Sequence, residues 1–171
     1  MAVTLEIVSQ EGWSAVTVRR VAEAVEYAPP VVYEYFSSKA GLMRGVVVEG
    51  HRKLQGSYSQ AFAEEPKEVL RMISQAHWNF AFLNRHLYQL MFEICKPFPD
   101  ENINAIGGRI EALFRKLVGD EMRTQELMFN WICLLQGYIL NLMRNDVPPQ
   151  LFGIAANQLF DRAIGRFLAS I

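Results

Sequence analysis

Pro29 and Pro30 stand side by side between two short helical patterns, and they constrain the local fold more than any other feature of the chain. Proline has a fixed φ and no backbone N–H, so it opens a helix but does not continue one. A helix is therefore predicted to begin at residue 29 or 30 and to run to Phe36. Thr17 suits the N-cap of a preceding helix over residues 18–25. Two short helices joined by a turn are the usual device for placing a helix in the DNA major groove.

The rest of the chain is also predicted to be helical, because apolar residues recur at three- and four-residue spacing nearly throughout. Ser37 or Ser38 is expected to cap the helix after the proline-led one. The predicted fold class is all-α, with an N-terminal three-helix helix-turn-helix module at residues 1–48 and a larger helical ligand-binding and dimerisation bundle at residues 49–171. Besides the two short helices, the pattern predicts helices over 2–11, 39–62, 66–84, 87–95, 101–118, 121–144 and 150–170.

The last two predicted helices carry more apolar surface than one face can hold. A helix that is apolar over most of its circumference is buried on more than one side. We therefore expect a homodimer in which the helices at 121–144 and 150–170 of each chain pack as a four-helix bundle. The apolar sets are Leu127, Met128, Trp131, Ile132, Leu134, Leu135, Tyr138, Ile139 and Leu142, and then Leu151, Ile154, Ala155, Leu159, Phe160, Ile164, Phe167 and Leu168.

Composition argues against several other classes of protein. Two cysteines and three scattered histidines form no recognisable metal-ligand set, and no catalytic constellation or phosphate-binding glycine loop is present. We expect no enzyme activity, metal or cofactor. Cys95 and Cys133 could form a single disulfide, but two buried thiols are the favoured expectation. The longest apolar-rich stretch, residues 127–143, is too short and polar for a confident membrane span, and no signal peptide is apparent, so a soluble cytoplasmic protein is expected.

The charge pattern gives only weak support for nucleic-acid binding. The net charge is −1, and residues 1–56 hold equal numbers of Lys/Arg and Glu. Any positive patch in the N-terminal module must therefore come from geometry. The chain also begins part-way through its first helix, so either the module is naturally short or a basic segment lies upstream.

The N-terminal residues resemble the TetR family of bacterial transcriptional regulators. The motif elements occur in order and at matching spacing over about residues 2–48. They are Glu11-Gly12-Trp13, Thr17-Val18, Val21-Ala22, Tyr33-Glu34-Tyr35-Phe36, and Lys39 with Leu42. The family usually has glycine where this chain has Glu26. Since a glutamate there is expected to avoid positive φ, the turn geometry is expected to differ.

The resemblance implies a homodimer whose two N-terminal modules dock in successive major grooves of a double-stranded DNA operator. It implies phosphate contacts from Thr17, Tyr33, Tyr35 and Lys39, with Ala28, Pro29, Pro30 and Val31 nearest the base edges. None of residues 28–31 can make a bidentate hydrogen bond to a base. Two interpretations stay open: apolar contact with thymine methyl groups together with shape readout, or prolines that only fix the helix start.

A second resemblance, to the WHG-type ligand domain of some TetR regulators, covers part of the C-terminal region. It is carried by residues 78–92 and by Trp131 with Gln136-Gly137, where Gln136 replaces the usual His. An aromatic and methionine set could line an apolar pocket or simply form core. The ligand-binding candidates are His77, Trp78, Phe82, Tyr88, Met91, Phe92, Trp131 and Tyr138.

Taken together, these patterns favour a TetR-type transcriptional regulator, a repressor that an unidentified apolar or amphipathic small molecule releases from DNA. The alternative is a helical ligand- or partner-binding dimer with weak or lost DNA binding. The glycine-bearing helix at 39–62 is the candidate for the element that moves between the two states.

Overall fold

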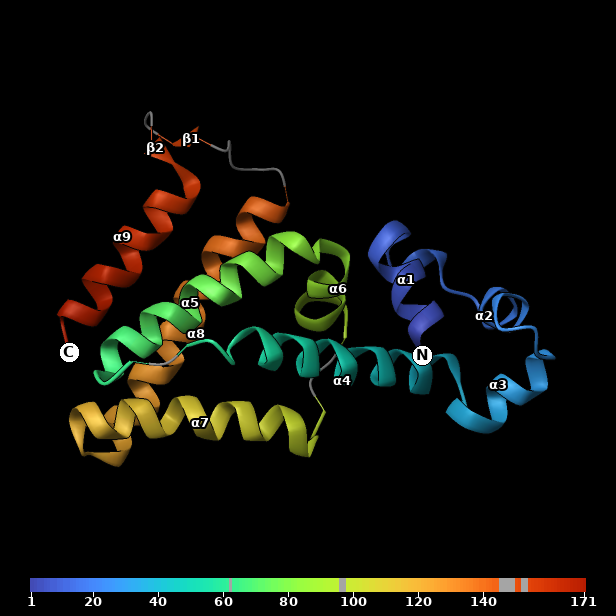
Figure 1. Cartoon of the computed structure of the whole chain (residues 1–171), viewed down its shortest axis with the longest axis horizontal. Coiled ribbons are helices and arrows are strands. Elements are labelled where there is room, and N and C mark those ends of the chain that lie inside the picture. The colour runs from blue at the N-terminus through green and yellow to red at the C-terminus, as the bar shows by residue number, and fades with distance from the viewer. Residues whose placement is uncertain (62, 96–97, 145–149, 152–153) are drawn as a thin grey trace. The chain divides into compact units, whose positions relative to one another are not determined.

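The computed structural model describes residues 1–61, 63–95, 98–144, 150–151 and 154–171. Figure 1 shows that helices account for nearly all of the described chain, which confirms the all-α fold class. The chain forms two compact units, and it passes between them at residues 53/54, 82/83 and 103/104. The predicted division at residue 48 between DNA binding and ligand binding concerns function, and it stays a prediction.

The first unit comprises Met1–Lys53 and Leu83–Ile103. It contains the helices α1 (Ala2–Glu11), η1 (Trp13–Ala15), α2 (Val18–Ala24), α3 (Pro29–Phe36), most of α4 (Lys39–Ser57), α6 (Arg85–Gln89) and η2 (Leu90–Ile94). The second segment of this unit covers the first, because α1 packs against α6. Its core is built from side chains that include Val8, Ala22, Leu42, Val46 and Leu87, all fully buried.

The second unit comprises Leu54–Phe82 and Asn104–Ile171. It contains α5 (Pro66–Leu83), α7 (Glu101–Val118), α8 (Glu121–Met143), β1 (Gln150–Leu151), β2 (Ile154–Ala155) and α9 (Ala156–Ala169), apart from the helix ends that lie in the first unit. Trp131 is buried in its core, and its indole N–H donates to Ser74 Oγ over 3.0 Å, so neither polar atom is left unsatisfied. No described helix is both long enough and apolar enough to cross a bilayer.

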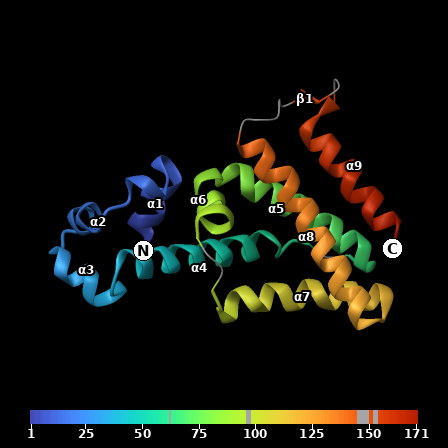
Figure 2. The same ribbon diagram turned by 180° about the vertical axis from the view of Figure 1, so that it is seen from behind.

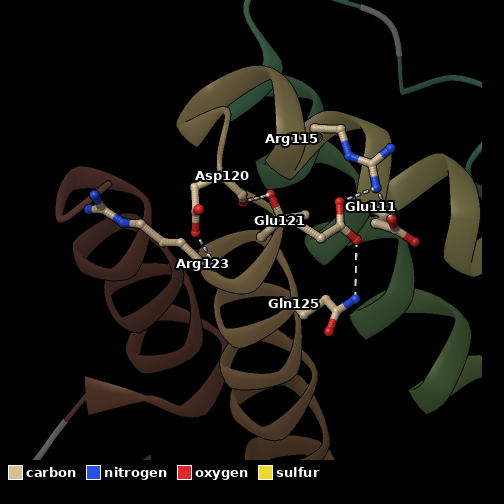
Figure 3. Close-up of polar contacts among 7 residues, drawn as sticks. Glu111, Arg115, Asp120, Glu121, Arg123 and Gln125 are labelled. Atoms are coloured by element: carbon tan, nitrogen blue, oxygen red, sulfur yellow. Dashed lines mark hydrogen bonds and ion pairs between the residues drawn. The ribbon is translucent and has the colours of Figure 1, made fainter.

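The start of α8 is fixed by a polar junction with α7, shown in Figure 3. Gly119 adopts a positive φ of 69°, and the Asp120 carboxylate then accepts from the Arg123 backbone N–H over 2.7 Å as the N-cap of α8. Arg115 at the end of α7 donates to Glu111 over 2.5 Å and to Glu121 over 2.7 Å. These contacts fix where α8 begins.

Some predicted helix limits were wrong. The helix expected at 150–170 begins only at Ala156, because β1 pairs antiparallel with β2 in a two-residue ladder. The helix expected at 87–95 is α6 followed by one π-type turn, in which the Cys95 N–H donates to the Leu90 carbonyl over 2.9 Å. The helix expected to end at residue 62 ends at Ser57. The break expected at 147–149 lies outside the described residues.

Candidate nucleic-acid interface

The helix-turn-helix begins with a capped helix, as the sequence predicts. The Thr17 hydroxyl oxygen accepts from the Arg20 backbone N–H over 3.1 Å, and α2 follows from Val18. Val18, Val21 and Ala22 are buried, so they hold α2 on the first unit. Thr17 itself is exposed, and its hydroxyl hydrogen can still donate to an acceptor outside the protein.

The turn after α2 differs from the expectation. Glu26 adopts a left-handed conformation with φ of 58°, although a glutamate was expected to avoid positive φ. The reason is a Schellman arrangement: the Tyr27 N–H donates to the Ala22 carbonyl over 3.0 Å, and the Glu26 N–H donates to the Glu23 carbonyl over 3.2 Å. These bonds satisfy carbonyl groups at the end of α2 and offset the unfavourable φ. The turn keeps its glycine-type geometry without glycine.

Helix α3 starts at the two prolines, as predicted, with Ala28 as its cap. Ala28, Pro29 and Pro30 are exposed and Val31 is half-buried, so this apolar helix start is open to a partner. Val32 is the one buried side chain of α3. Because two of the first helix positions lack an N–H, this end of α3 offers a phosphate fewer backbone donors than an ordinary helix start.

The tyrosines of α3 lie outside the core. Tyr33 is 51% exposed and Tyr35 is 80% exposed, so both hydroxyl groups are available for hydrogen bonds to phosphate. Tyr27, in the turn between α2 and α3, is also 63% exposed, although sequence reasoning did not select it. The signal that could have identified it is its position directly before the cap of α3.

The connection between α3 and α4 positions Lys39. Ser38 caps α4, since its hydroxyl oxygen accepts from the Gly41 backbone N–H over 3.0 Å. The Lys39 ammonium group then lies 5.4 Å from the centroid of the Trp13 ring, within the range of a cation–π interaction. This contact restrains the lysine side chain while leaving its residue exposed.

The two arginines of α2 are engaged in ion pairs inside the unit. Arg19 binds Glu23 over 2.7 Å, and Arg20 binds Glu11 over 2.5 Å. The hydrogen bond from Arg20 lowers the pKa of the Glu11 carboxyl below its usual value and raises the pKa of the guanidinium group. Both pairs are exposed, and exposed pairs are worth little, so a phosphate can replace the glutamate as partner.

The predicted ligand-binding residues are divided between the two units. Tyr88, Met91 and Phe92 belong to the first unit, and the other five belong to the second unit. Within the second unit, Trp78 packs against Phe82 and Phe160, with ring centroids 4.6 Å apart in each pair. His77 is buried, and its Nδ1 shares a hydrogen bond of 2.6 Å with the Tyr58 hydroxyl. Burial raises the pKa of the Tyr88 hydroxyl.

An open apolar cleft of about 400 Å³ lies between α8 and α9, and only Tyr138 of the predicted ligand set lines it. The described residues that line it are Cys133, Leu134, Gly137, Tyr138, Asn141, Leu142, Ala156 and Leu159. Cys133 is exposed at this cleft and Cys95 is half-buried, so the prediction that both thiols are buried was wrong. Sequence reasoning missed this site because it depends on how α9 packs on α8. Among the described residues, no cluster of three or more His, Cys, Asp or Glu could hold a metal ion.

Solved structures with this fold include several bacterial regulators. A TetR variant from Acinetobacter baumannii AYE, in complex with minocycline, superposes with a TM-score of 0.76 at 16% identity, covering 99% of this chain and 92% of the other. A tetR family regulatory protein from Rhodococcus gives 0.62 at 15% identity, covering 98% and 92%. The TetR family regulator PfmR from Thermus thermophilus gives 0.58 at 20% identity, covering 96% and 94%. At these identities the likeness shows a shared fold.

The N-terminal module matches the model of a known family. No curated protein sequence matches the chain. Residues 1–46, which hold Thr17, the Glu26 turn, both α3 tyrosines and Lys39, match the model of the bacterial regulatory proteins of the tetR family. The match covers the N-terminal module, and over the whole chain the likeness to TetR regulators is one of fold.

Proposed function

We propose that the protein is a homodimeric transcriptional repressor that binds a double-stranded operator through α2 and α3 and is released by an apolar or amphipathic small molecule. The observation that carries this proposal is the exposed face of residues 27–39. It presents an apolar helix start flanked by tyrosine hydroxyl groups and one restrained lysine. A soluble module has no folding reason to leave three tyrosines exposed together, whereas a DNA backbone offers each hydroxyl group an acceptor.

Two surfaces of the second unit support the dimer and the ligand. The outer side of α8 carries exposed apolar side chains, among them Met122 and Phe129, as expected for a helix that packs against a second chain. The related structure from Acinetobacter was solved with minocycline, so this fold accommodates a drug-sized amphipathic molecule. In this chain, the aromatic set in the second unit, where Trp78 packs against Phe82 and Phe160, is the candidate ligand site.

One observation favours the alternative, a ligand- or partner-binding dimer with weak DNA binding. Both arginines of α2 already pair with glutamates of the same unit, so each must exchange that partner before it can bind a phosphate. Neutral hydroxyl groups can dock on a backbone, but they do not release counterions.

The two functions are separated by titrating the full chain against random-sequence duplex at several salt concentrations. A repressor of this type should bind with a log–log salt slope of several negative units, because a dimer neutralises several phosphates. The Tyr33→Phe/Tyr35→Phe double variant should bind more weakly with the same slope, since a hydroxyl group carries no charge. Weak binding with a flat salt response would instead support the alternative.

A further inference from the structure

The outward face of α8 is centred on Cys133. In a helix of about 3.6 residues per turn, Met122, Phe129 and Leu140 all lie within roughly 40° of Cys133 around the helix axis. The opposite side of α8 carries the buried residues Thr124, Trp131, Leu135 and Ile139. Met122 is 81% exposed and Phe129 is 67% exposed, while Cys133 is exposed and Leu140 is half-buried. Figure 2 shows this helix beside α9 within the second unit.

This face is complementary to itself in one orientation. Phe129 and Gly137 lie four residues before and four residues after Cys133. If two copies of α8 run antiparallel with their two-fold axis at Cys133, each Phe129 comes level with Gly137 of the other copy. Phe129 is the bulkiest exposed side chain of the face, and Gly137 is its widest gap, because a Cβ placed at Gly137 meets no atom within 4 Å.

The backbone carbonyl of Gly137 has a hydrogen-bond partner, so an apolar side chain can pack over it. The Asn141 side-chain amide donates to the Gly137 carbonyl over 2.6 Å. A phenyl ring over the glycine therefore leaves that carbonyl satisfied. The next positions outward pair Glu126 with Leu140 and Met122 with Arg144, where long side chains can cover the edge of the contact with their charged ends in water.

We infer that a second copy of this chain covers α8 in an antiparallel register centred on Cys133, with Phe129 of each protomer packed over Gly137 of the other. This rests on the proposed homodimer and adds its register. An isologous interface requires such self-complementarity, since each contact occurs twice about the axis. A parallel register would instead place Phe129 against Phe129 and leave both glycine gaps empty.

Disulfide crosslinking in the full chain tests the register. In a Cys95→Ser/Cys133→Ser background, Phe129→Cys and Gly137→Cys are prepared separately and then refolded together. Mild oxidation should link the mixture into a covalent dimer and should link neither variant alone. Positions 129 and 137 are about 12 Å apart along one helix, so two copies of the same position stand too far apart for a disulfide. With the native cysteines present, Cys133 should crosslink and Cys95 should not.

Sedimentation equilibrium separates failure of the register from failure of the dimer. Phe129→Ala should raise the dimer dissociation constant roughly tenfold or more. Leu83→Ala, which removes an exposed apolar side chain of the first unit, should leave it unchanged. Crosslinking of Phe129→Cys with itself, or a dimer that resists Phe129→Ala and forms no mixed crosslink, would overturn the register but not the dimer. A monomeric wild-type chain would remove both the register and the proposed dimer.

Discussion

At the scale of single residues, Glu26 holds a conformation that L-amino acids avoid. Its φ of 58° places the Cβ close to the following carbonyl, at a cost of about 1 kcal/mol. Replacing Glu26 by glycine removes this cost while keeping the Schellman bonds. Glu26→Gly should therefore raise the free energy of unfolding by about 1 kcal/mol, measured by chemical denaturation.

Glu26→Ala is the control for that substitution. It removes the same charge but keeps a Cβ at the left-handed position, so it should not stabilise the protein. An equal gain from alanine and glycine would show that the charge, and not the backbone conformation, is responsible.

Gly41 lies where the surrounding backbone leaves no room for a side chain. A Cβ there would clash with the Phe36 carbonyl oxygen, a backbone atom of the turn between α3 and α4. Gly41→Ala should destabilise the protein by about 3 kcal/mol or more, because backbone on both sides must shift. The matched control is Gly108→Ala in the interior of α7, where a Cβ meets no atom within 4 Å.

Gly108→Ala should stabilise by up to about 1 kcal/mol through helix propensity. Thermal or denaturant unfolding of both variants gives the comparison. Equal and small effects of the two substitutions would mean that the backbone at Phe36 shifts to make room for the Cβ. Gly41 would then not be required for the turn between α3 and α4.

At the scale of elements, α4 carries a titrating group that is held neutral. Burial lowers the pKa of His51 below its usual value, against smaller raising effects from a hydrogen bond to the Val47 carbonyl and from the Asp100 charge. Its Nδ1 lies 2.9 Å from that carbonyl, and its ring packs 5.6 Å from Phe92. The unfolded chain therefore binds a proton at His51 more readily than the folded chain does.

The sign of the pH effect follows from this difference. Stability from neutral His51 is complete above the unfolded pKa of about 6.5, and it is lost as the pH falls below that value. The lowered carboxyl pKa values, such as that of Glu11, affect stability only as the pH falls toward and below the usual carboxyl pKa of 4.5. Chemical denaturation should show that the free energy of unfolding of the wild type decreases as the pH falls from 7 to 5. His51→Gln should show a weaker dependence on pH. The same pH dependence in the wild type and in His51→Gln would show that His51 is not its cause.

The glycines of α4 also test the proposal that this helix moves during release. A Cβ at Gly50 would lie 2.6 Å from Met91 Sδ, and one at Gly45 would lie 2.7 Å from Met1 Cε. Gly45→Ala and Gly50→Ala should change release by the ligand without changing the affinity of the ligand-free protein for DNA. Gly56→Ala, with open space around it, is the control. Equal changes in both quantities would indicate a packing role and contradict the proposal.

At the scale of the whole molecule, local chemistry made most helix starts predictable. Thr17 and Ser38 fix the starts of α2 and α4 through side-chain caps, and Pro29 fixes the start of α3 through its restricted φ. Each of these effects acts within a few residues. The left-handed Glu26 was not predictable from its residue type, because two hydrogen bonds decide it.

Features that depend on tertiary packing could not be predicted. The exposure of Cys133 and the cleft at Gly137 depend on where α9 lies on α8. The division of the ligand candidates between two units arises because residues 83–103 pack with the N-terminal segment. Apolar periodicity identifies a buried face but not the neighbour that buries it.

The central claim is that residues 17–39 bind duplex DNA, and Lys39 tests it most directly. Lys39 and Lys53 are both exposed lysines of α4, separated by about 21 Å along the helix. The measurement is the salt dependence of duplex affinity for the wild type, Lys39→Gln and Lys53→Gln. A phosphate contact contributes about 0.9 to the log–log slope, so losing Lys39 from both protomers should reduce its magnitude by roughly 2, and losing Lys53 should leave it unchanged. Equal slopes for the wild type and Lys39→Gln, or equal losses from both variants, would contradict the account.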